Sequence, residues 1–148
     1  MIPPAPYNST LVLRRTFTAS RRRVFRAWIT RRALEQWLRP RGMGMTVRSL
    51  DARVGGSFCF ELENGNCIRG TYLQVVSPEK LVFTWSSEAN QDQETIVTLD
   101  FLDLGPMTEV VLTHEGLSTE AMRTLVEGGW PSLLDALASV LSSPHLDD

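Results

Sequence analysis

The feature that most constrains the fold is a series of six short segments rich in β-branched and aromatic residues, covering residues 45–51, 57–63, 67–76, 80–86, 94–104 and 107–114. Brief turns separate these segments, among them Gly55-Gly56, Asn64-Gly65 and Gly105-Pro106. A crossover between parallel strands takes about a dozen residues or more, so connections this short join antiparallel neighbours. The sequence therefore predicts a meandering antiparallel sheet.

Two short helices are predicted between a first strand at residues 10–18 and this sheet. Ser20 has the side chain of an N-cap, and the apolar residues after it recur at helical spacing. A second helix is predicted to end near Trp37, because Pro40 and Gly42 follow it and do not continue a helix.

A long helix is predicted near the end of the chain, with Ser118 as its N-cap. Gly128, Gly129 and Pro131 interrupt it: each glycine costs roughly 1 kcal/mol relative to alanine, and the proline removes a backbone donor. We therefore expect a kink or a restart there. The apolar side chains form one stripe that must be buried against the sheet: Met122, Val126, Trp130, Leu133, Leu134, Leu137 and Leu141.

The composition is that of one ordinary globular domain, since 43% of the 148 residues are hydrophobic and 22% are charged. Residues 1–9 are predicted to form a flexible N-terminal arm, residues 10–142 the domain, and residues 143–148 a frayed tail. No stretch approaches the ~18 to 20 consecutive apolar residues that cross a bilayer, and the N-terminus lacks the order of a signal peptide. These features predict a cytoplasmic protein.

Charge is distributed unevenly along the chain, although the net charge is only −2. Residues 1–53 contain twelve arginines and two acidic residues, whereas residues 54–148 contain three basic and fifteen acidic residues. A compact fold interleaves the two segments, so that opposite charges neutralise one another. We therefore do not expect nucleic-acid binding, and we interpret the arginines of the two short helices as solvated faces.

The two cysteines, Cys59 and Cys67, flank the turn at Asn64-Gly65. If these residues form a two-residue hairpin turn, Cys67 pairs with Leu62, whose side chain points to the face opposite Cys59. The sequence therefore predicts free thiols. The cysteines and the two histidines match no zinc-binding spacing, and we expect no metal or cofactor.

Several short motifs follow one another along the chain: Arg15-Thr16-Phe17, Val24-Phe25-Arg26-Ala27-Trp28, Trp37-Leu38-Arg39-Pro40, Asp51-Ala52-Arg53-Val54-Gly55-Gly56-Ser57-Phe58, Leu81-Val82-Phe83-Thr84-Trp85, Leu112-Thr113-His114-Glu115-Gly116, and Gly129-Trp130 with Leu133-Leu134. Together, over about residues 11–141, they resemble the activator-of-heat-shock-ATPase-like branch of the START-like (SRPBCC) superfamily. The resemblance implies an α+β helix-grip fold. In that fold a curved antiparallel sheet wraps a long C-terminal helix, and two short helices follow the first strand.

The resemblance implies a cavity between sheet and helix, and it leaves three functions open. The first is a binding module for a small hydrophobic or aromatic molecule. The second is an enzyme of the cyclase or hydratase kind that uses the same cavity. The third is an interaction module for a heat-shock ATPase or another protein, which the expected lack of a separate N-terminal domain weakens. A monomer and a homodimer both fit the sequence.

Strand alternation and the helix stripe place a set of side chains on the two faces that meet. These side chains can pack as a solid core or leave a void. Trp37, beside a Pro-Gly loop, and Trp130, beside the helix interruption, are expected at the mouth of such a void. With the resemblance, we expect ligand contacts from Trp37, Phe58, Phe60, Phe83, Trp85, Val97, Leu99, Phe101, Leu112, His114, Met122, Val126, Trp130 and Leu134.

His114 is the histidine expected inside the fold and is the candidate for a catalytic residue. A neutral imidazole can bond a ligand carbonyl or act as a general base. No carboxylate or nucleophile stands at a spacing that would orient it. We therefore expect neighbouring groups to satisfy its nitrogens, and we assign no catalytic residue.

Overall fold

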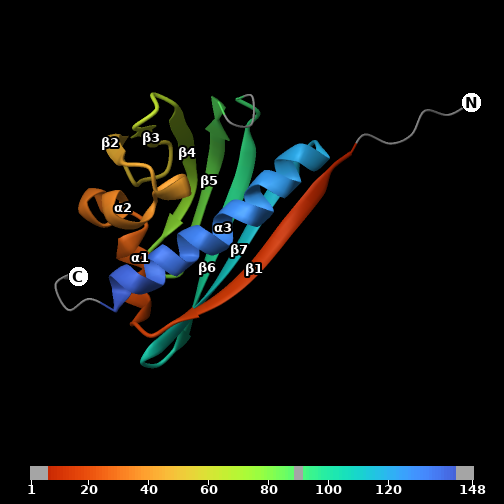
Figure 1. Cartoon of the computed structure of the whole chain (residues 1–148). Helices are drawn as coiled ribbons and strands as arrows, with labels where there is room; N and C mark the ends of the chain where they lie inside the picture. The colour runs from red at the N-terminus through yellow and green to blue at the C-terminus, as the bar shows by residue number, and fades with distance from the viewer. Residues whose placement is uncertain (1–6, 89–91, 143–148) are drawn as a thin grey trace, which may run out of the picture.

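The structure, a computed structural model, describes residues 7–88 and 92–142. Its elements in chain order are β1 (Ser9–Phe17), α1 (Arg21–Ala27), α2 (Arg31–Trp37), the 3-10 turn η1 (Pro40–Gly42), β2 (Met45–Leu50), β3 (Ser57–Leu62), β4 (Cys67–Val76), β5 (Lys80–Ser87), β6 (Thr95–Leu104), β7 (Met107–Leu117) and α3 (Glu120–Leu141). The strands form one antiparallel sheet in the order β1-β7-β6-β5-β4-β3-β2. The long helix α3 crosses one face of this sheet (Figure 1). The predicted helix-grip fold is confirmed.

The alternating apolar rows of the strands face α3, as predicted. On neighbouring strands Phe83 pairs with Val97 and Leu99 pairs with Leu112, and all four side chains are buried. The rows are in register, so they form one continuous apolar floor beneath the helix. On β6 and β7 the polar residues between them, such as Thr98 and Thr113, are partly exposed, whereas Thr84 of β5 is buried.

The sheet bends where the residue pairing shifts. One irregularity lies in β2 between Val47 and Ser49, and another lies in β4 next to Tyr72. Such bulges bend a strand and increase its twist. Near the second shift, Gly70 lies so close to β5 that a Cβ atom would stand 1.9 Å from the Thr84 carbonyl oxygen. A glycine is therefore required where β4 folds toward β5.

The two short helices begin and end as predicted. The Ser20 hydroxyl accepts a hydrogen bond from the Arg23 amide at 3.3 Å, which caps α1. The helix α2 ends at Trp37, whose indole N–H donates to the Ala27 carbonyl at 2.9 Å and ties α2 to α1. Pro40 begins the 3-10 turn that follows.

The predicted N-cap of α3 is wrong, and of the predicted kink or restart the restart is absent. Its N-cap is Thr119, which accepts from the Met122 amide at 3.1 Å, whereas the Ser118 hydroxyl instead contacts the Met122 sulfur. The helix also runs from Glu120 to Leu141 without the restart that Pro131 suggested. Pro131 lies on the exposed side of α3, so water can bond the carbonyl group that the proline leaves without a donor.

The cysteine register also differs from the prediction. Cys67 pairs with Glu61 and not with Leu62, because the turn has one more residue than a two-residue hairpin and the Leu62 amide donates to the Asn66 carbonyl. A one-residue shift moves a side chain to the other face of the sheet. Cys59 and Cys67 therefore share one face, and both are free thiols, as predicted.

Some charges of the two segments neutralise one another in the fold, as expected. Arg15 of the basic segment pairs with Asp135 at 2.6 Å, and Arg14 lies 3.6 Å from Glu109. The predicted arm and tail lie outside the described residues, apart from residues 7–9, of which Ser9 begins β1. Within the described part of the chain, no helix combines the length and apolar character needed to cross a membrane.

Candidate functional site

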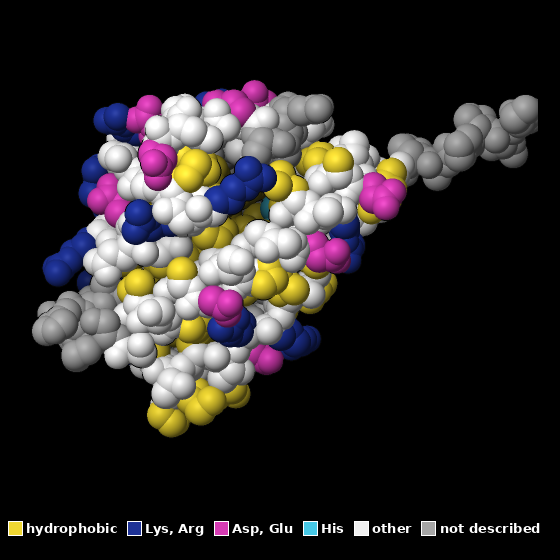
Figure 2. Space-filling model, in the orientation of Figure 1, with side chains coloured by type: hydrophobic (Ala, Val, Ile, Leu, Met, Phe, Trp, Pro, Cys, Tyr) yellow, Lys and Arg dark blue, Asp and Glu magenta, His cyan; other side chains and the backbone are white. Residues whose placement is uncertain are grey.

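A pocket of about 180 Å³ lies between the middle of α3, the η1 loop and one end of β3, β4 and β5. Figure 2 shows the surface hollowed beside α3, with hydrophobic side chains in the hollow and a Lys or Arg side chain at its edge. The lining residues are Pro40, Arg41, Met43, Leu62, Asn64, Asn66, Ile68, Trp85, Ser87, Leu125, Val126, Gly129, Trp130 and Leu133.

Two indole rings form one wall of the pocket. The centroids of Trp85 and Trp130 lie 5.2 Å apart with an angle of 44° between the ring planes. Aliphatic side chains from β3, β4 and α3, such as Leu62, Ile68 and Val126, complete the apolar lining. An apolar cavity of about 150 Å³ is large enough for benzene. This pocket, which is open on one side, therefore has room for one or two aromatic rings.

A buried chain of hydrogen bonds holds one of these rings in place. The Trp130 indole N–H donates to His114 Nδ1 at 3.0 Å, and His114 Nε2 lies 2.7 Å from the Thr95 hydroxyl oxygen. The Thr95 hydroxyl donates to the Trp85 carbonyl at 2.9 Å. An indole N–H can only donate, so Nδ1 is the acceptor and the proton of the neutral ring is on Nε2.

His114 is a neutral positioning residue in this arrangement. It is 0% exposed, and burial lowers its pKa from 6.5 to about 4. Both ring nitrogens are bonded, so neither is presented to the pocket. The imidazole fixes the Trp130 ring and connects α3 to β5 and β6 through Thr95. In the ranges that the structure describes, no group of three or more His, Cys, Asp or Glu side chains is placed to hold a metal ion.

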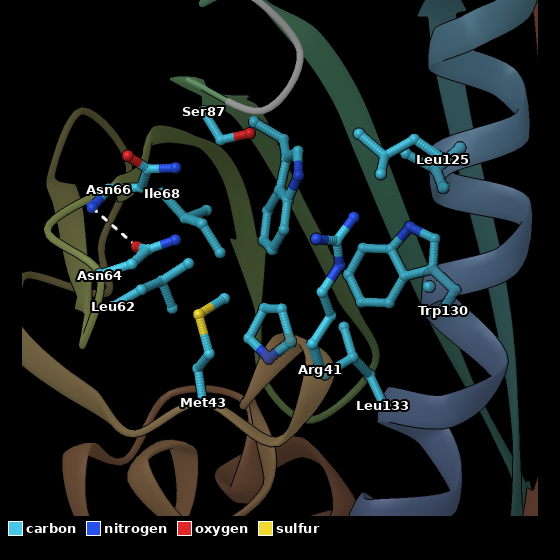
Figure 3. Close-up of a pocket in the computed structure, with 14 residues that line it drawn as sticks. Arg41, Met43, Leu62, Asn64, Asn66, Ile68, Ser87, Leu125, Trp130 and Leu133 are labelled. Carbon is cyan, nitrogen blue, oxygen red and sulfur yellow. Dashed lines mark hydrogen bonds between the residues drawn. The ribbon is translucent and has the colours of Figure 1, made fainter.

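The mouth of the pocket is polar. Arg41 follows Pro40 in η1, and Figure 3 shows its side chain extending from that turn into the pocket. Asn64 and Asn66 lie on the opposite side, in the turn between β3 and β4, and the Asn64 side-chain oxygen accepts from the Asn66 amide at 3.0 Å. Arg41 has φ 55° and ψ 26°, a left-handed conformation that is uncommon outside glycine.

The predicted ligand contacts are distributed between this pocket and the core. Trp85, Val126 and Trp130 line the pocket. Trp37 is fully buried and borders an adjacent hollow of about 770 Å³ between α2, η1 and α3, which shares Arg41 and Leu125 with the pocket. Ligand contact stays a prediction for the others, which are buried among one another and do not line the pocket: Phe58, Phe60, Phe83, Val97, Leu99, Phe101, Leu112, His114, Met122 and Leu134.

Sequence reasoning missed the polar mouth altogether. The sequence indicates the Pro40-Arg41-Gly42 loop as the stop of a helix and as the neighbour of Trp37, and Asn64 as a turn residue, and it assigns no pocket role to Arg41 or Asn64. The available signal was that both turns adjoin the predicted apolar faces. Which side chain of such a turn points inward depends on its backbone conformation, as the left-handed Arg41 shows.

Comparisons with known proteins agree with this fold. The protein CV1439 from Chromobacterium violaceum is 28% identical, with a TM-score of 0.79 over 90% of this chain and 97% of that one. CalU16 from Micromonospora echinospora is 26% identical, with a TM-score of 0.68 over 94% of this chain and 79% of that one. A Staphylococcus epidermidis protein at 24% identity has a TM-score of 0.78 over 93% and 92%, which supports the fold alone.

No curated protein matches the chain. The family profile described as Activator of Hsp90 ATPase homolog 1-like protein, however, matches residues 18–142, from the end of β1 to the end of α3. The match covers the two short helices, six of the seven strands and the helix that encloses the pocket. The chain belongs to the Activator of Hsp90 ATPase homolog 1-like family.

Proposed function

We propose that this protein binds a small hydrophobic, aromatic molecule in the pocket between α3 and the bent end of the sheet. The observation that carries the proposal is the pair of indole rings, Trp85 and Trp130, held 5.2 Å apart at the wall of an apolar hollow. Aromatic rings bind a planar ligand through offset or edge contacts. Removing about 200 Å² of apolar ligand surface from water contributes about 5 kcal/mol before the cost of immobilisation.

Binding without catalysis is the simpler form of this function. A cyclase or hydratase would need an acid or base that reaches the ligand, and His114 already uses both nitrogens. The described residues that line the pocket include no histidine, no cysteine and no carboxylate.

A protein partner is the second candidate, because the family description names an ATPase activator. The residues available for it are the exposed arginines of α1 and α2, such as Arg22, Arg31 and Arg32. A pull-down with a heat-shock ATPase at low salt tests this candidate. Retention of the ATPase by the wild type, and its loss when these arginines are replaced by glutamine, would support it. Absence of any retention would exclude it.

The pocket is tested by titration with 1-naphthylacetamide, an uncharged two-ring compound. Isothermal calorimetry and tryptophan fluorescence measure the binding. We expect saturable binding by the wild type and a loss of at least tenfold in affinity for Val126→Phe, because the larger ring occupies the hollow. The matched control is Val76→Phe, at a position that is 44% exposed and outside the pocket. Equal affinities in both variants would contradict the proposal.

A further inference from the structure

Two polar side chains at the pocket mouth, Arg41 and Asn64, present hydrogen-bond donors, and Asn66 and Ser87, which also line the pocket, carry both donors and acceptors. Arg41 presents a guanidinium group, which has only donors. The Asn64 side-chain oxygen accepts one bond from the Asn66 amide, and the NH₂ group of the same side chain can donate to a ligand. Among the described residues that line the pocket, none carries a negative charge. A ligand that only filled the apolar part would leave these exposed donors bonded to water alone.

The carboxylates near this mouth are engaged elsewhere. Glu63 accepts a hydrogen bond from the Gly44 amide at 2.5 Å. Glu88 accepts from the Cys67 amide at 2.6 Å, which lowers the pKa of this carboxyl, and it also lies 3.5 Å from Arg69. Arg41 has no hydrogen-bond or ion-pair partner within residues 7–88 and 92–142. Its positive charge is therefore not neutralised by the described part of the chain.

The backbone at Arg41 is consistent with a functional role for the side chain. A left-handed conformation costs a residue with a Cβ atom roughly 1–2 kcal/mol. Glycine adopts this conformation without that cost, and Gly42 beside it does so at φ 73°. Strained positions of this kind are concentrated at ligand sites, and here the conformation directs the guanidinium toward the pocket (Figure 3).

We propose that the ligand of this pocket carries a carboxylate, which Arg41 binds at the mouth while the aromatic part lies against Trp85 and Trp130. This inference rests on the proposed function and names its ligand class, an aromatic or otherwise apolar carboxylate. A carboxylate matches the planar fork of one guanidinium through two parallel N–H···O bonds. The amide group of Asn64 is placed to donate a further bond.

The experiment compares 1-naphthylacetate with 1-naphthylacetamide, which have the same rings and differ in charge. At low ionic strength we expect the wild type to bind the carboxylate at least tenfold more tightly than the amide. Arg41→Gln removes this preference, because it lowers the affinity for the carboxylate by a larger factor than the affinity for the amide. Arg32→Gln, the matched control, deletes the same charge on the exposed side of α2 and keeps the preference. Added salt reduces the preference, because Arg41 is exposed.

Three results would overturn the inference. Equal affinities of the wild type for the two compounds would show that the pocket does not select an anion, and would leave the proposed function intact. A preference for the carboxylate that persists in Arg41→Gln would assign the anion to another group. If neither compound binds to the wild type, both the inference and the proposed function are contradicted. Circular dichroism melting shows whether each variant is folded.

Discussion

The two halves of the α3 interface differ in how completely they are closed. Toward its C-terminus, Leu134, Leu137 and Leu141 pack on a solid core, and Phe25 of α1 meets Phe101 of β6 edge-on at 5.1 Å. Toward the middle of the helix, the same apolar stripe borders the pocket. One amphipathic surface therefore closes the core at one end and leaves a cavity at the other.

The difference lies in what packs beside the helix. At the closed end α1 contributes Phe25, and the Arg23 guanidinium donates to the Leu141 carbonyl at 2.9 Å, which caps the end of α3. At the open end the neighbour is the η1 loop, with Pro40 and Arg41, and the pairing of β4 with β5 shifts between Tyr72 and Gln74. A helix turn with large apolar side chains fills space that a short polar loop leaves open.

The largest expected effect comes from replacing one leucine by alanine in each half of the α3 interface and comparing the two losses of stability. Leu137→Ala removes a side chain that is 0% exposed in the closed half, and we expect it to lower the free energy of unfolding by about 2–5 kcal/mol. Leu125→Ala acts at the pocket, where the side chain is 37% exposed, and we expect less than about 1 kcal/mol. Urea unfolding measures both, and equal losses would show that the two halves are packed alike.

A second effect is a pH dependence of stability caused by His114, the histidine whose hydrogen bonds hold the pocket wall. The pKa of His114 is lowered by burial from 6.5 to about 4, so the unfolded chain takes up a proton at a higher pH than the folded chain. The free energy of unfolding should therefore fall as the pH decreases from about 6.5 to about 4, by about 3 kcal/mol in total.

The control for this pH dependence is His114→Gln. Glutamine can accept from the Trp130 indole and donate to the Thr95 hydroxyl, but it does not titrate. Urea unfolding at a series of pH values should show a steeper loss for the wild type than for the variant between pH 6.5 and 4. Parallel curves for the two proteins would mean that His114 is not held neutral by the fold.

The smallest expected effect separates stability from binding at the open end. Arg41→Gly removes the left-handed strain at φ 55°, and we expect the free energy of unfolding to rise by about 1 kcal/mol. The same variant should lose the preference for 1-naphthylacetate. Thermal unfolding and calorimetry measure the two effects, and a less stable variant would show that the Arg41 side chain supports the loop itself.

Local patterns predicted most of the elements because the signals that form them lie within a few residues. Ser20 caps α1 as expected, and Cys67–Val76 is the strand that its β-branched residues predicted. Errors of one residue occurred where two local choices compete. Thr119 took the capping role from Ser118, and the turn at Asn64 closed with a register that places Cys67 on the same face as Cys59.

Local patterns along the chain are sufficient to predict the order of the elements, the apolar rows of the sheet and the stripe of α3, because alternation and helical spacing act between near neighbours. The tertiary packing sets where the rows and the stripe meet closely and where they separate. It also decided that Arg41 and Asn64 face the space left between them. These features depend on the bend of the sheet and on the relative volumes of α1 and the η1 loop, which are properties of segments distant in sequence. Spacing along the chain does not encode them.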